Sequence, residues 1–328
     1  MKRIAIVGAG RIAPAHLEGL KALSSRAKVV AICDMNEKLR QERQNAFNIP
    51  EGFSSVDELL KWGEFDISAV LTPPDVRSEV CIPIIEARKH LLVEKPFSLS
   101  LDEATTIVDT AEKTGVILAV DQNFRWIPPA PILRQKILDG AIGRVLSVLL
   151  VDTVWRDERE GWRNKTSQLA LSVMGIHWLD RIRWITGEDG MRVYTSSLIS
   201  KILTSSGEDI TSTVITLESG AVATLVHHWA SHSRGINNSL QIDGTNGSAV
   251  VRGEELIWIG KDGKQTKESF SGIRIESSMA LSWTELLDAI DEGRTPCHSG
   301  RDNINTVALL TGAYLSASTG ESVSINQL

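Results

Sequence analysis

Cysteine is scarce in this sequence of 328 residues, and neither sign of charge is in large excess. The three cysteines, Cys33, Cys81 and Cys297, are widely spaced, which excludes a disulfide-rich scaffold and matches no zinc-binding spacing. Cys33 and Cys81 fall inside apolar periods, so we expect core residues in a reducing compartment and no metal site. A formal net charge of −6 without a basic block argues against nucleic acid as a partner.

Long apolar runs, repeats and low-complexity segments are also missing. No apolar span of about twenty residues is present, and charged residues run straight into the first strand without a signal peptide. We therefore expect a cytoplasmic protein with no membrane partner. A hydrophobic content of 42% and a charged content of 23% are ordinary for a globular chain, whose length allows two domains.

The beginning of the chain predicts a strand, a glycine turn and a helix. Ile4–Val7 is a short apolar run, typical of a strand buried on both faces of a parallel sheet. A G-x-G-x-x-A turn follows, in which Gly8 permits the bend and Gly10 leaves room for a pyrophosphate. The N–H groups near Arg11 and Ile12, at the positive end of the helix dipole, then face the phosphates.

An acidic residue follows the second apolar run, where a dinucleotide-binding domain needs one. Lys28–Cys33 ends in Asp34, about 20 residues beyond the turn, the spacing of the acid that binds the ribose hydroxyls. Asp34 repels a 2′-phosphate, and Met35 and Asn36 offer no cation to hold one. The pattern therefore predicts NAD rather than NADP, the alternative being a tight turn of small residues without a ligand.

The first third of the chain alternates strand and helix, which is typical of a doubly wound parallel sheet. Ligands of such sheets lie beyond the carboxyl ends of the strands. Those ends carry Thr72-Pro73-Pro74, Glu94-Lys95-Pro96 and Asp121-Gln122-Asn123. We expect these three segments to border the cofactor.

The second part of the chain predicts an α/β domain with an open, mostly antiparallel sheet and helices on one face. The strands are expected at Val145–Val154, Val193–Leu203, Thr211–Leu217 and Ala221–Trp229, with a patterned helix at Val173–Ile185. Asp243-Gly244 and Asp262-Gly263 have the composition of hairpin turns. The open face needs cover, so we expect a homodimer or homotetramer. The chain thus divides into a dinucleotide-binding domain, 1–122, and a substrate-binding and oligomerisation domain, 123–328.

Lys95 is a candidate catalytic residue on its position alone. It follows an apolar strand and an acid, and Pro96 restricts it to extended geometry. An ammonium at that sheet edge would hydrogen-bond a substrate hydroxyl and stabilise the alkoxide that develops as hydride leaves. The alternative is a solvated lysine at a strand end.

His177 is a second candidate, on the patterned helix with Asp180 three residues later on the same face. Oxidation of an alcohol requires a group that accepts the hydroxyl proton, and histidine titrates near neutrality. Asp180 would orient His177, or would pair with Arg181 or Arg183. A half-buried histidine with structural partners is the alternative.

The loop at 155–163 is rich in charge and tryptophan. Arginine forks and indole faces suit carboxylates, polyols or sugar rings, so Trp162 and Arg163 are candidate substrate contacts. A solvated loop is the alternative. His227 and His228 end a strand, but they lack the carboxylate or cysteine pattern of a metal site.

Five short motifs together resemble a known family. They are Gly8-Ala9-Gly10-Arg11-Ile12, Thr72-Pro73-Pro74, Glu94-Lys95-Pro96, Asn123-Phe124-Arg125 and Gly175-Ile176-His177-Trp178-Leu179-Asp180. In order and spacing the sequence resembles the glucose–fructose oxidoreductase/inositol dehydrogenase (Gfo/Idh/MocA) family over essentially its whole length.

The resemblance implies a Rossmann domain followed by an α/β domain whose open sheet builds dimers or tetramers. It also implies NAD(P)-dependent oxidation or reduction at a carbon of a sugar, polyol or related ring. In that picture Lys95 stabilises the alkoxide and His177 exchanges the substrate's proton. The expected cofactor contacts are Gly8, Gly10, Arg11, Ile12, Asp34, Thr72, Pro73, Glu94 and Asn123. The expected substrate contacts are Arg125, Trp162, Arg163 and Asp180.

Two positions depart from the family pattern. Val173 stands where such dehydrogenases commonly carry an aspartate, so Asp180 or an acid of the 157–160 loop replaces it, or the chemistry is modified. Arg77 stands where relatives often have a histidine, which favours an anionic substrate unless it is a surface arginine. Two other functions stay open: an NAD-retaining enzyme that uses transient oxidation for elimination or glycoside cleavage, and a non-catalytic NAD-binding sensor.

Overall fold

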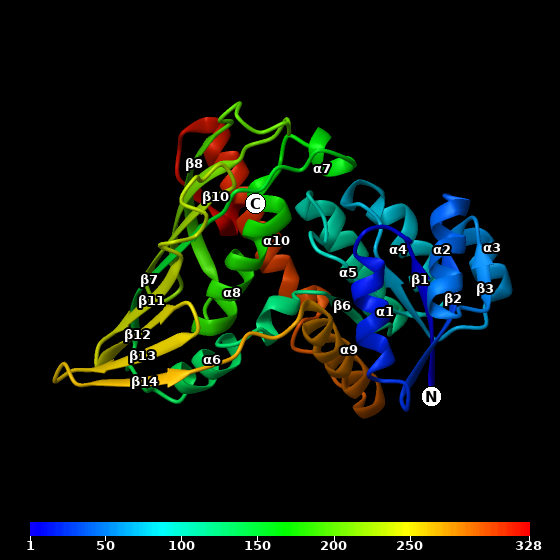
Figure 1. Ribbon diagram of the computed structural model, residues 1–328, viewed down its shortest axis with the longest axis horizontal. Helices are drawn as coiled ribbons and strands as arrows, with labels where there is room; N and C mark the ends of the chain where they lie inside the picture. Colours follow the sequence, from blue (N-terminus) through cyan, green and yellow to red (C-terminus); the bar gives the residue numbers. More distant parts are fainter. The chain divides into compact units, whose positions relative to one another are not determined.

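A computed structural model describes residues 1–328, which form two compact units (Figure 1). Unit 1 comprises Met1–Trp126 and Ile273–Ile304, and unit 2 comprises Ile127–Gly272 and Asn305–Leu328. No helix in the structure combines the length and apolar character needed to cross a bilayer.

Unit 1 contains a six-stranded parallel sheet in the order β3-β2-β1-β4-β5-β6, which confirms the expected doubly wound fold. Its strands are β1 (Lys2–Val7), β2 (Ala27–Cys33), β3 (Glu51–Phe53), β4 (Ile67–Val70), β5 (His90–Val93) and β6 (Leu118–Val120). The order reverses between β1 and β4, and this switch point is where such sheets bind ligands. β4 is buried along its whole length, as expected for a mostly apolar strand in the middle of a parallel sheet; Ser68 is its one polar residue.

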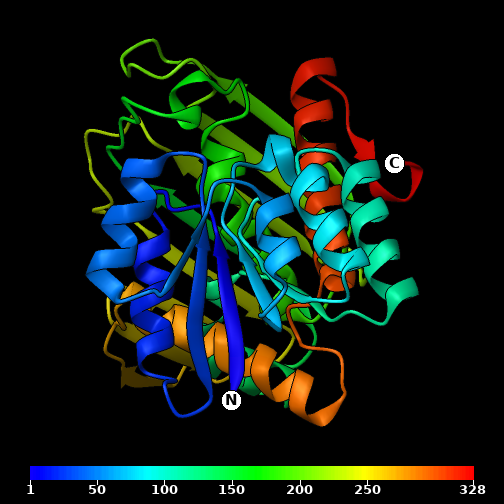
Figure 2. The same cartoon turned by 90° about the vertical axis from the view of Figure 1, so that its right-hand side faces the viewer.

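Helices lie on both sides of these strands (Figure 2). They are α1 (Ala13–Lys21), α2 (Glu37–Phe47), α3 (Val56–Trp62), α4 (Arg77–Glu86), α5 (Leu101–Thr114) and α9 (Ile275–Glu292). The side chains of Asn36, Ser55 and Ser100 each cap a helix by accepting the N–H three residues on. The first residues of α2, α3 and α5 are therefore set by the local sequence.

Helix α9 joins unit 1 from far along the chain and packs beside α1 (Figure 1). Trp283 and Leu286 of α9 share a buried cluster with Leu17 of α1. A Cβ at Gly19 would lie 2.9 Å from the carbonyl oxygen of Glu276, so glycine permits this close approach. The compact units are thus not consecutive segments, and the functional division at residue 122 stays a prediction.

Unit 2 is built on a nine-stranded sheet in the order β14-β13-β12-β11-β7-β10-β9-β8-β15. All neighbours pair antiparallel except β7 and β10, which confirms the expected mostly antiparallel sheet. The strands are β7 (Val145–Thr153), β8 (Gly190–Leu198), β9 (Ile210–Leu217), β10 (Val222–His228), β11 (Ser239–Gly244), β12 (Gly247–Arg252), β13 (Glu255–Gly260), β14 (Gln265–Ser269) and β15 (Val323–Ser324).

The helices of unit 2 are α6 (Ala130–Leu138), α7 (Trp162–Lys165), α8 (Ile176–Thr186) and the part of α10 (Gly300–Thr319) from Asn305 onward. Helix α8 packs on β7 and β10 and against α6. The predicted helix at Val173–Ile185 has a π-helical first turn, Leu171–Gly175, before α8 begins.

Two local predictions in unit 2 were wrong. Asp243 and Gly244 end β11 instead of forming the turn, because the chain reverses at Thr245 and Asn246. The strand predicted to run to Leu203 ends at Leu198, where its pairing with β9 stops at Ile210. Both errors come from composition, which marks a turn or a strand but not the register that ends it.

Candidate functional site

The glycine turn after β1 has the geometry of a phosphate-binding loop. Gly8 has φ of +107°, and a Cβ there would lie 3.0 Å from the carbonyl carbon of Leu71, so only glycine fits. A Cβ at Gly10 would meet nothing within 4 Å, so the turn opens onto free space. Ile12 is the N-cap of α1, which directs the positive end of that helix to the same place.

Asp34 is tied to this turn. Its carboxylate accepts the N–H of Ala9 at 2.6 Å and the N–H of Asn36 at 2.8 Å. Thr72 follows β4 beside Gly8, and its buried hydroxyl has no hydrogen-bond partner. An open turn, a positioned acid and an orphaned hydroxyl at one sheet edge fit a dinucleotide.

Other predicted cofactor contacts are distributed around the turn. Arg11 is exposed, and Ile12 and Pro73 are half-buried. Asn123 is buried, and its amide donates to the Ser278 hydroxyl of α9 at 2.8 Å. The amide of Asn123 therefore has a structural contact within unit 1.

Lys95 follows β5, and the residue before it is held by a buried network. Glu94 is 6% exposed; one carboxylate oxygen accepts the backbone N–H of Lys95 at 3.0 Å, and the other lies 3.0 Å from His16 Nε2. Burial alone would raise the pKa of the Glu94 carboxyl, but His16 and the charges of Lys95 and Arg77 lower it below its usual range. Glu94 is thus an ionised anchor for the start of the Lys95 segment.

Arg77 holds the other side of the Lys95 segment. Its guanidinium is 1% exposed and donates to the carbonyls of Val70 (3.2 Å), Pro96 (3.2 Å) and Phe97 (3.1 Å). Both expectations for Arg77, an anion-binding or a surface arginine, were wrong, because these three carbonyls take up its N–H donors inside the core. Arg77 instead ties the residues after Lys95 to the end of β4.

Arg125 is also held inside unit 1. Only 1% of it is exposed; its guanidinium pairs with Asp302 and donates to the carbonyl of Cys297. These contacts give it a structural role, and its predicted contact with substrate is untested.

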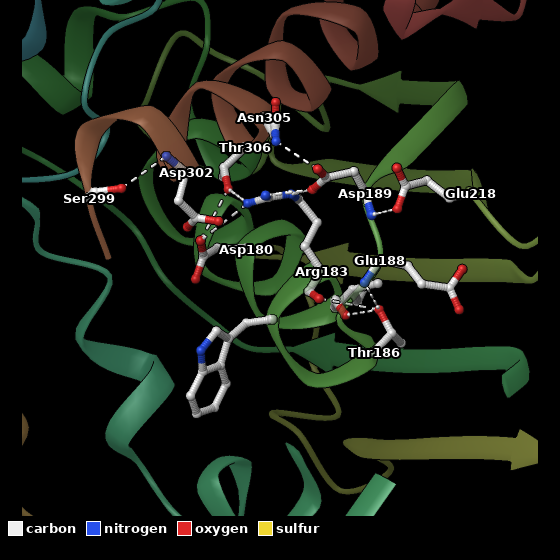
Figure 3. Close-up of polar contacts among 12 residues, drawn as sticks. Asp180, Arg183, Thr186, Glu188, Asp189, Glu218, Ser299, Asp302, Asn305 and Thr306 are labelled. Carbon is white, nitrogen blue, oxygen red and sulfur yellow. Dashed lines mark hydrogen bonds and ion pairs between the residues drawn. The ribbon is translucent and has the colours of Figure 1, made fainter. Parts of the chain in front are cut away.

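In unit 2, His177 and Asp180 lie near the start of α8 and are 2% and 1% exposed. Asp180 accepts the Thr306 hydroxyl at 3.1 Å, and Thr306 in turn accepts from Arg183 at 2.7 Å (Figure 3). Arg183 also lies 3.9 Å from Asp180. Of the two arginines predicted as partners of Asp180, the structure therefore brings up Arg183.

Arg181 points elsewhere. It donates to the carbonyl of Ile127 at 2.7 Å, and burial lowers the pKa of its guanidinium to about 10. On the far side of Arg183, Asp189 accepts from Arg183 at 2.6 Å and from Asn305 at 2.7 Å (Figure 3). Asp180 therefore belongs to a buried polar network that extends to α10.

Val173 lies in an apolar environment. It is 1% exposed and packs in a cluster with Leu169, Ala170, Leu203 and Trp229. An acid at this position would be buried among apolar side chains, so the local core explains the valine.

In the neighbouring loop, Glu158 accepts from Arg156 at 2.6 Å and lies 3.4 Å from Arg163. Asp157 accepts the Thr204 hydroxyl at 2.7 Å. The predicted substrate contacts Trp162 and Arg163 are half-buried on α7, with the guanidinium 5.6 Å from the indole centroid. Asp157 and Glu158 therefore have partners within unit 2.

Three further residues complete the network around Glu94, and of these the sequence singled out Asp121 but not the other two: His16, Asp121 and Trp283. Asp121 stood at a recognised strand end, and His16 lies in the first helix after the glycine turn. Trp283 comes from α9, and nothing in the sequence pairs it with His16 across 267 positions.

Comparisons with known proteins agree with this geometry. Residues 2–122 match the oxidoreductase family with an NAD-binding Rossmann fold, and residues 132–250 match the C-terminal domain of GFO/IDH/MocA proteins. D-apiose dehydrogenase of Paraburkholderia graminis is 27% identical over 99% of this chain and 90% of its own length. Glucose-6-phosphate 3-dehydrogenase of Bacillus subtilis is 31% identical over 58% of this chain and 55% of its own. An Agrobacterium radiobacter oxidoreductase, solved with NAD+, L-tartaric acid and magnesium, shares the fold with a TM-score of 0.93 at 24% identity over 99% of both chains.

Proposed function

The chain belongs to the Gfo/Idh/MocA family of NAD-binding oxidoreductases, and we propose that its substrate is a sugar, a cyclic polyol or a related derivative. Hydride would pass between NAD and a hydroxyl-bearing carbon of that substrate. Support comes from the named substrates of two relatives, an apiose and a phosphorylated glucose.

The observation that carries the proposal is the position of Lys95. It follows β5, as Gly8 follows β1, and the carboxyl ends of parallel strands meet at one edge of the sheet. Glu94 and Arg77 hold the backbone on either side of it. A lysine whose backbone is held at the same sheet edge as a dinucleotide turn suits an alcohol dehydrogenation better than a purely binding role.

The residues proposed to hold NAD are those at the strand ends of unit 1. The turn at Gly8, Gly10, Arg11 and Ile12 would bind the pyrophosphate, and Asp34 the ribose hydroxyls. The remaining contacts are proposed for Thr72, Pro73, Glu94 and Asn123. Bound NAD would supply the hydride acceptor for oxidation of an alcohol carbon. The acid at Asp34 disfavours the 2′-phosphate of NADP.

Lys95 and His177 are proposed to have different roles at the reacting hydroxyl. The Lys95 ammonium would donate a hydrogen bond to the alkoxide, and His177 would accept the hydroxyl proton during oxidation and return it during reduction. Asp180 would orient the substrate or His177 through its polar network. Arg125, Trp162 and Arg163 are proposed as further substrate contacts.

The test is turnover with a panel of pentoses, hexoses, inositols and phosphorylated sugars. We expect NADH to accumulate, measured by its absorbance, with at least one of them and not when Lys95→Ala replaces the wild type. Cleavage of a glycoside without net NADH would instead support transient oxidation, which the apolar setting of Val173 keeps open. Turnover that is unchanged in Lys95→Ala would contradict the assignment.

The exposed face of the unit 2 sheet is proposed to pair with a second copy. Leu149 of β7, Tyr194 of β8 and Val222 of β10 are each more than 40% exposed on this sheet. Light scattering coupled to size exclusion should give a dimer or tetramer mass, and Leu149→Asp should lower it. The three cysteines are free, which suits a reducing compartment such as the cytoplasm.

A further inference from the structure

Four buried side chains from different parts of unit 1 meet around His16 and Glu94, the residue that precedes Lys95. His16 comes from α1, Glu94 and Asp121 follow β5 and β6, and Trp283 comes from α9. His16 is 0% exposed, and its Nε2 lies 3.0 Å from Glu94 and 3.6 Å from Asp121. On the other side of the ring, the indole N–H of Trp283 points at Nδ1 at 3.2 Å.

The indole fixes the tautomer of His16. A tryptophan side chain can only donate, so Nδ1 must be the unprotonated acceptor, and in the neutral ring the proton then sits on Nε2. Nε2–H faces carboxylates, which can only accept when ionised. Both ring nitrogens therefore have complementary partners in one tautomer and in no other.

The same indole argues against a metal ion in this cluster. His16, Glu94 and Asp121 place three ligand atoms within 4.8 Å of one another, a spacing that a divalent cation could bridge. A neutral imidazole that binds metal through Nε2 must carry its proton on Nδ1, where it would oppose the Trp283 N–H. The contacts of His16 therefore favour a proton, and not a divalent cation, at Nε2.

Asp121 is the member that gains or loses a proton. It is 1% exposed, and the donors that face it, Nε2 of His16 at 3.6 Å and the Ser282 hydroxyl, do not complete a full hydrogen bond to either oxygen. Burial raises the pKa of its carboxyl to about 6; His16 and Lys95 lower it and Glu94 raises it further. The other groups that face the cluster are Arg77 from α4, which acts on Glu94, and Ser282 from α9.

We propose that Trp283, His16 and Glu94 form a hydrogen-bond chain of fixed direction that positions Lys95, with Asp121 as its proton-accepting neighbour. The chain runs from the indole N–H to Nδ1, from Nε2–H to one oxygen of Glu94, and from the Lys95 backbone N–H to the other oxygen. The role of Lys95 rests on the proposed function, whereas the direction of the chain does not. His16, Glu94 and Trp283 are positioning residues, since each acts through the next.

Without Trp283, the tautomer of His16 would no longer be fixed. Burial lowers the pKa of the His16 imidazole, but the two carboxylates outweigh it and raise that pKa. Without an N–H donor at Nδ1, the ring is free to take a second proton there as the pH falls. The charge of the cluster beside Glu94 would then change as the ring takes up that proton.

The first experiment measures the tautomer directly in the NAD-free protein. ¹⁵N-histidine NMR, assigned with His16→Gln, should show the Nε2–H tautomer wherever His16 is neutral, and in Trp283→Phe a second proton should bind Nδ1 at a higher pH than in the wild type. An Nδ1–H tautomer in the wild type, or the same titration of His16 in both proteins, would overturn the inference, whatever the substrate is.

The second experiment measures the pH dependence of kcat. Trp283→Phe should lower kcat about 10- to 100-fold and add an ionisation near neutral pH, with the Kd for NAD unchanged. The matched control is Trp258→Phe, which likewise removes an indole N–H from a side-chain hydrogen bond, here the one to the carboxylate of Glu268 in unit 2. His16→Gln keeps an uncharged N–H donor and should retain kcat within about threefold, whereas His16→Leu should not.

These outcomes separate the two proposals. Equal pH profiles for Trp283→Phe and Trp258→Phe would refute the positioning role. NMR could instead show the Nε2–H tautomer of His16 while no hydride transfer depends on Lys95. That result would refute the proposed function and leave the direction of the hydrogen-bond chain intact.

Discussion

The two units each bury a histidine between a tryptophan indole and a carboxylate, but only in unit 1 do all contacts of the ring agree with one tautomer. In unit 1, the indole of Trp283 lies at Nδ1 of His16, and carboxylates alone lie at Nε2. In unit 2, the indole of Trp229 donates to Nε2 of His227 at 3.0 Å. The same Nε2 also lies 3.2 Å from the carbonyl of Ala170, which needs a donor. Trp229 at Nε2 and Asp152 at Nδ1 favour the Nδ1–H tautomer of His227, whereas the Ala170 carbonyl calls for a proton on Nε2.

The carboxylates of the two networks differ as well. Asp152, 2.9 Å from Nδ1 of His227, also accepts the N–H groups of Trp178 (2.8 Å) and Asn238 (3.1 Å). Asp121 in unit 1 completes no full hydrogen bond, with Nε2 of His16 at 3.6 Å and the Ser282 hydroxyl facing it. A carboxylate with several full hydrogen bonds stabilises the fold, whereas a buried carboxylate without them costs stability and is able to titrate. Of the two, the unit 1 network is the one we connect to function.

The largest effect that would sharpen this comparison is expected at Lys95, because the unit 1 network ends at the backbone N–H of this lysine. Lys95→Met should lower kcat about 10³-fold, since it removes the proposed donor to the alkoxide. The Kd for NAD, measured by fluorescence titration, should stay within about threefold. Lys113→Met, on the exposed side of α5, is the control and should keep wild-type kcat. If Lys95→Met kept wild-type kcat, there would be no reason to connect the unit 1 network to function rather than the unit 2 network.

A smaller effect on stability is expected from Asp121→Asn. The pKa of this carboxyl is raised to about 6 in the folded protein from an ordinary value of 3.8, so the folded state binds a proton that the unfolded state has lost. Wild-type stability should therefore fall as the pH rises from about 4 to about 6 and stay lower above that. Asp121→Asn should be more stable than wild type by about 1–3 kcal/mol at pH 8.

Thermal unfolding from pH 4 to pH 8 measures this difference, which should vanish toward the acid end. A constant difference between the variant and the wild type at every pH would show that Asp121 does not titrate in the folded protein. The two histidine networks would then be equivalent.

The sequence predicted the strand ends of unit 1 but not the network beneath them. Apolar runs ending in Asp34, Lys95 and Asp121 are local patterns, and parallel pairing brings their ends to one edge. The partner of His16 on α9 is a tertiary contact that no periodicity encodes. Arg77 shows the same limit, because a buried arginine that binds carbonyls and a surface arginine look alike in a sequence.

Unit 2 was predictable to the level of strands and one helix. The alternation of β9 and β10 and the pattern of α8 fixed their positions to within a few residues. The partners of Asp180 were not, since Thr306 is brought up by a helix 126 positions away. Side-chain networks depend on packing between elements, and that information is not local.

The smallest effect is expected in unit 2, at His227. Its ring is 0% exposed and contacts Asp152, Trp229 and Ala170, so His227→Gln should cost about 1 kcal/mol of unfolding free energy through imperfect replacement of these contacts. The pH dependence of kcat should keep its wild-type shape, because no part of the proposed chain to Lys95 runs through this ring. Chemical denaturation gives the first quantity and steady-state kinetics the second. His227→Gln could instead add an ionisation to the pH profile of kcat as large as that expected for Trp283→Phe. In that case, neither the hydrogen bonds of Asp152 nor the fixed tautomer of His16 would distinguish a structural buried histidine from a functional one in this protein.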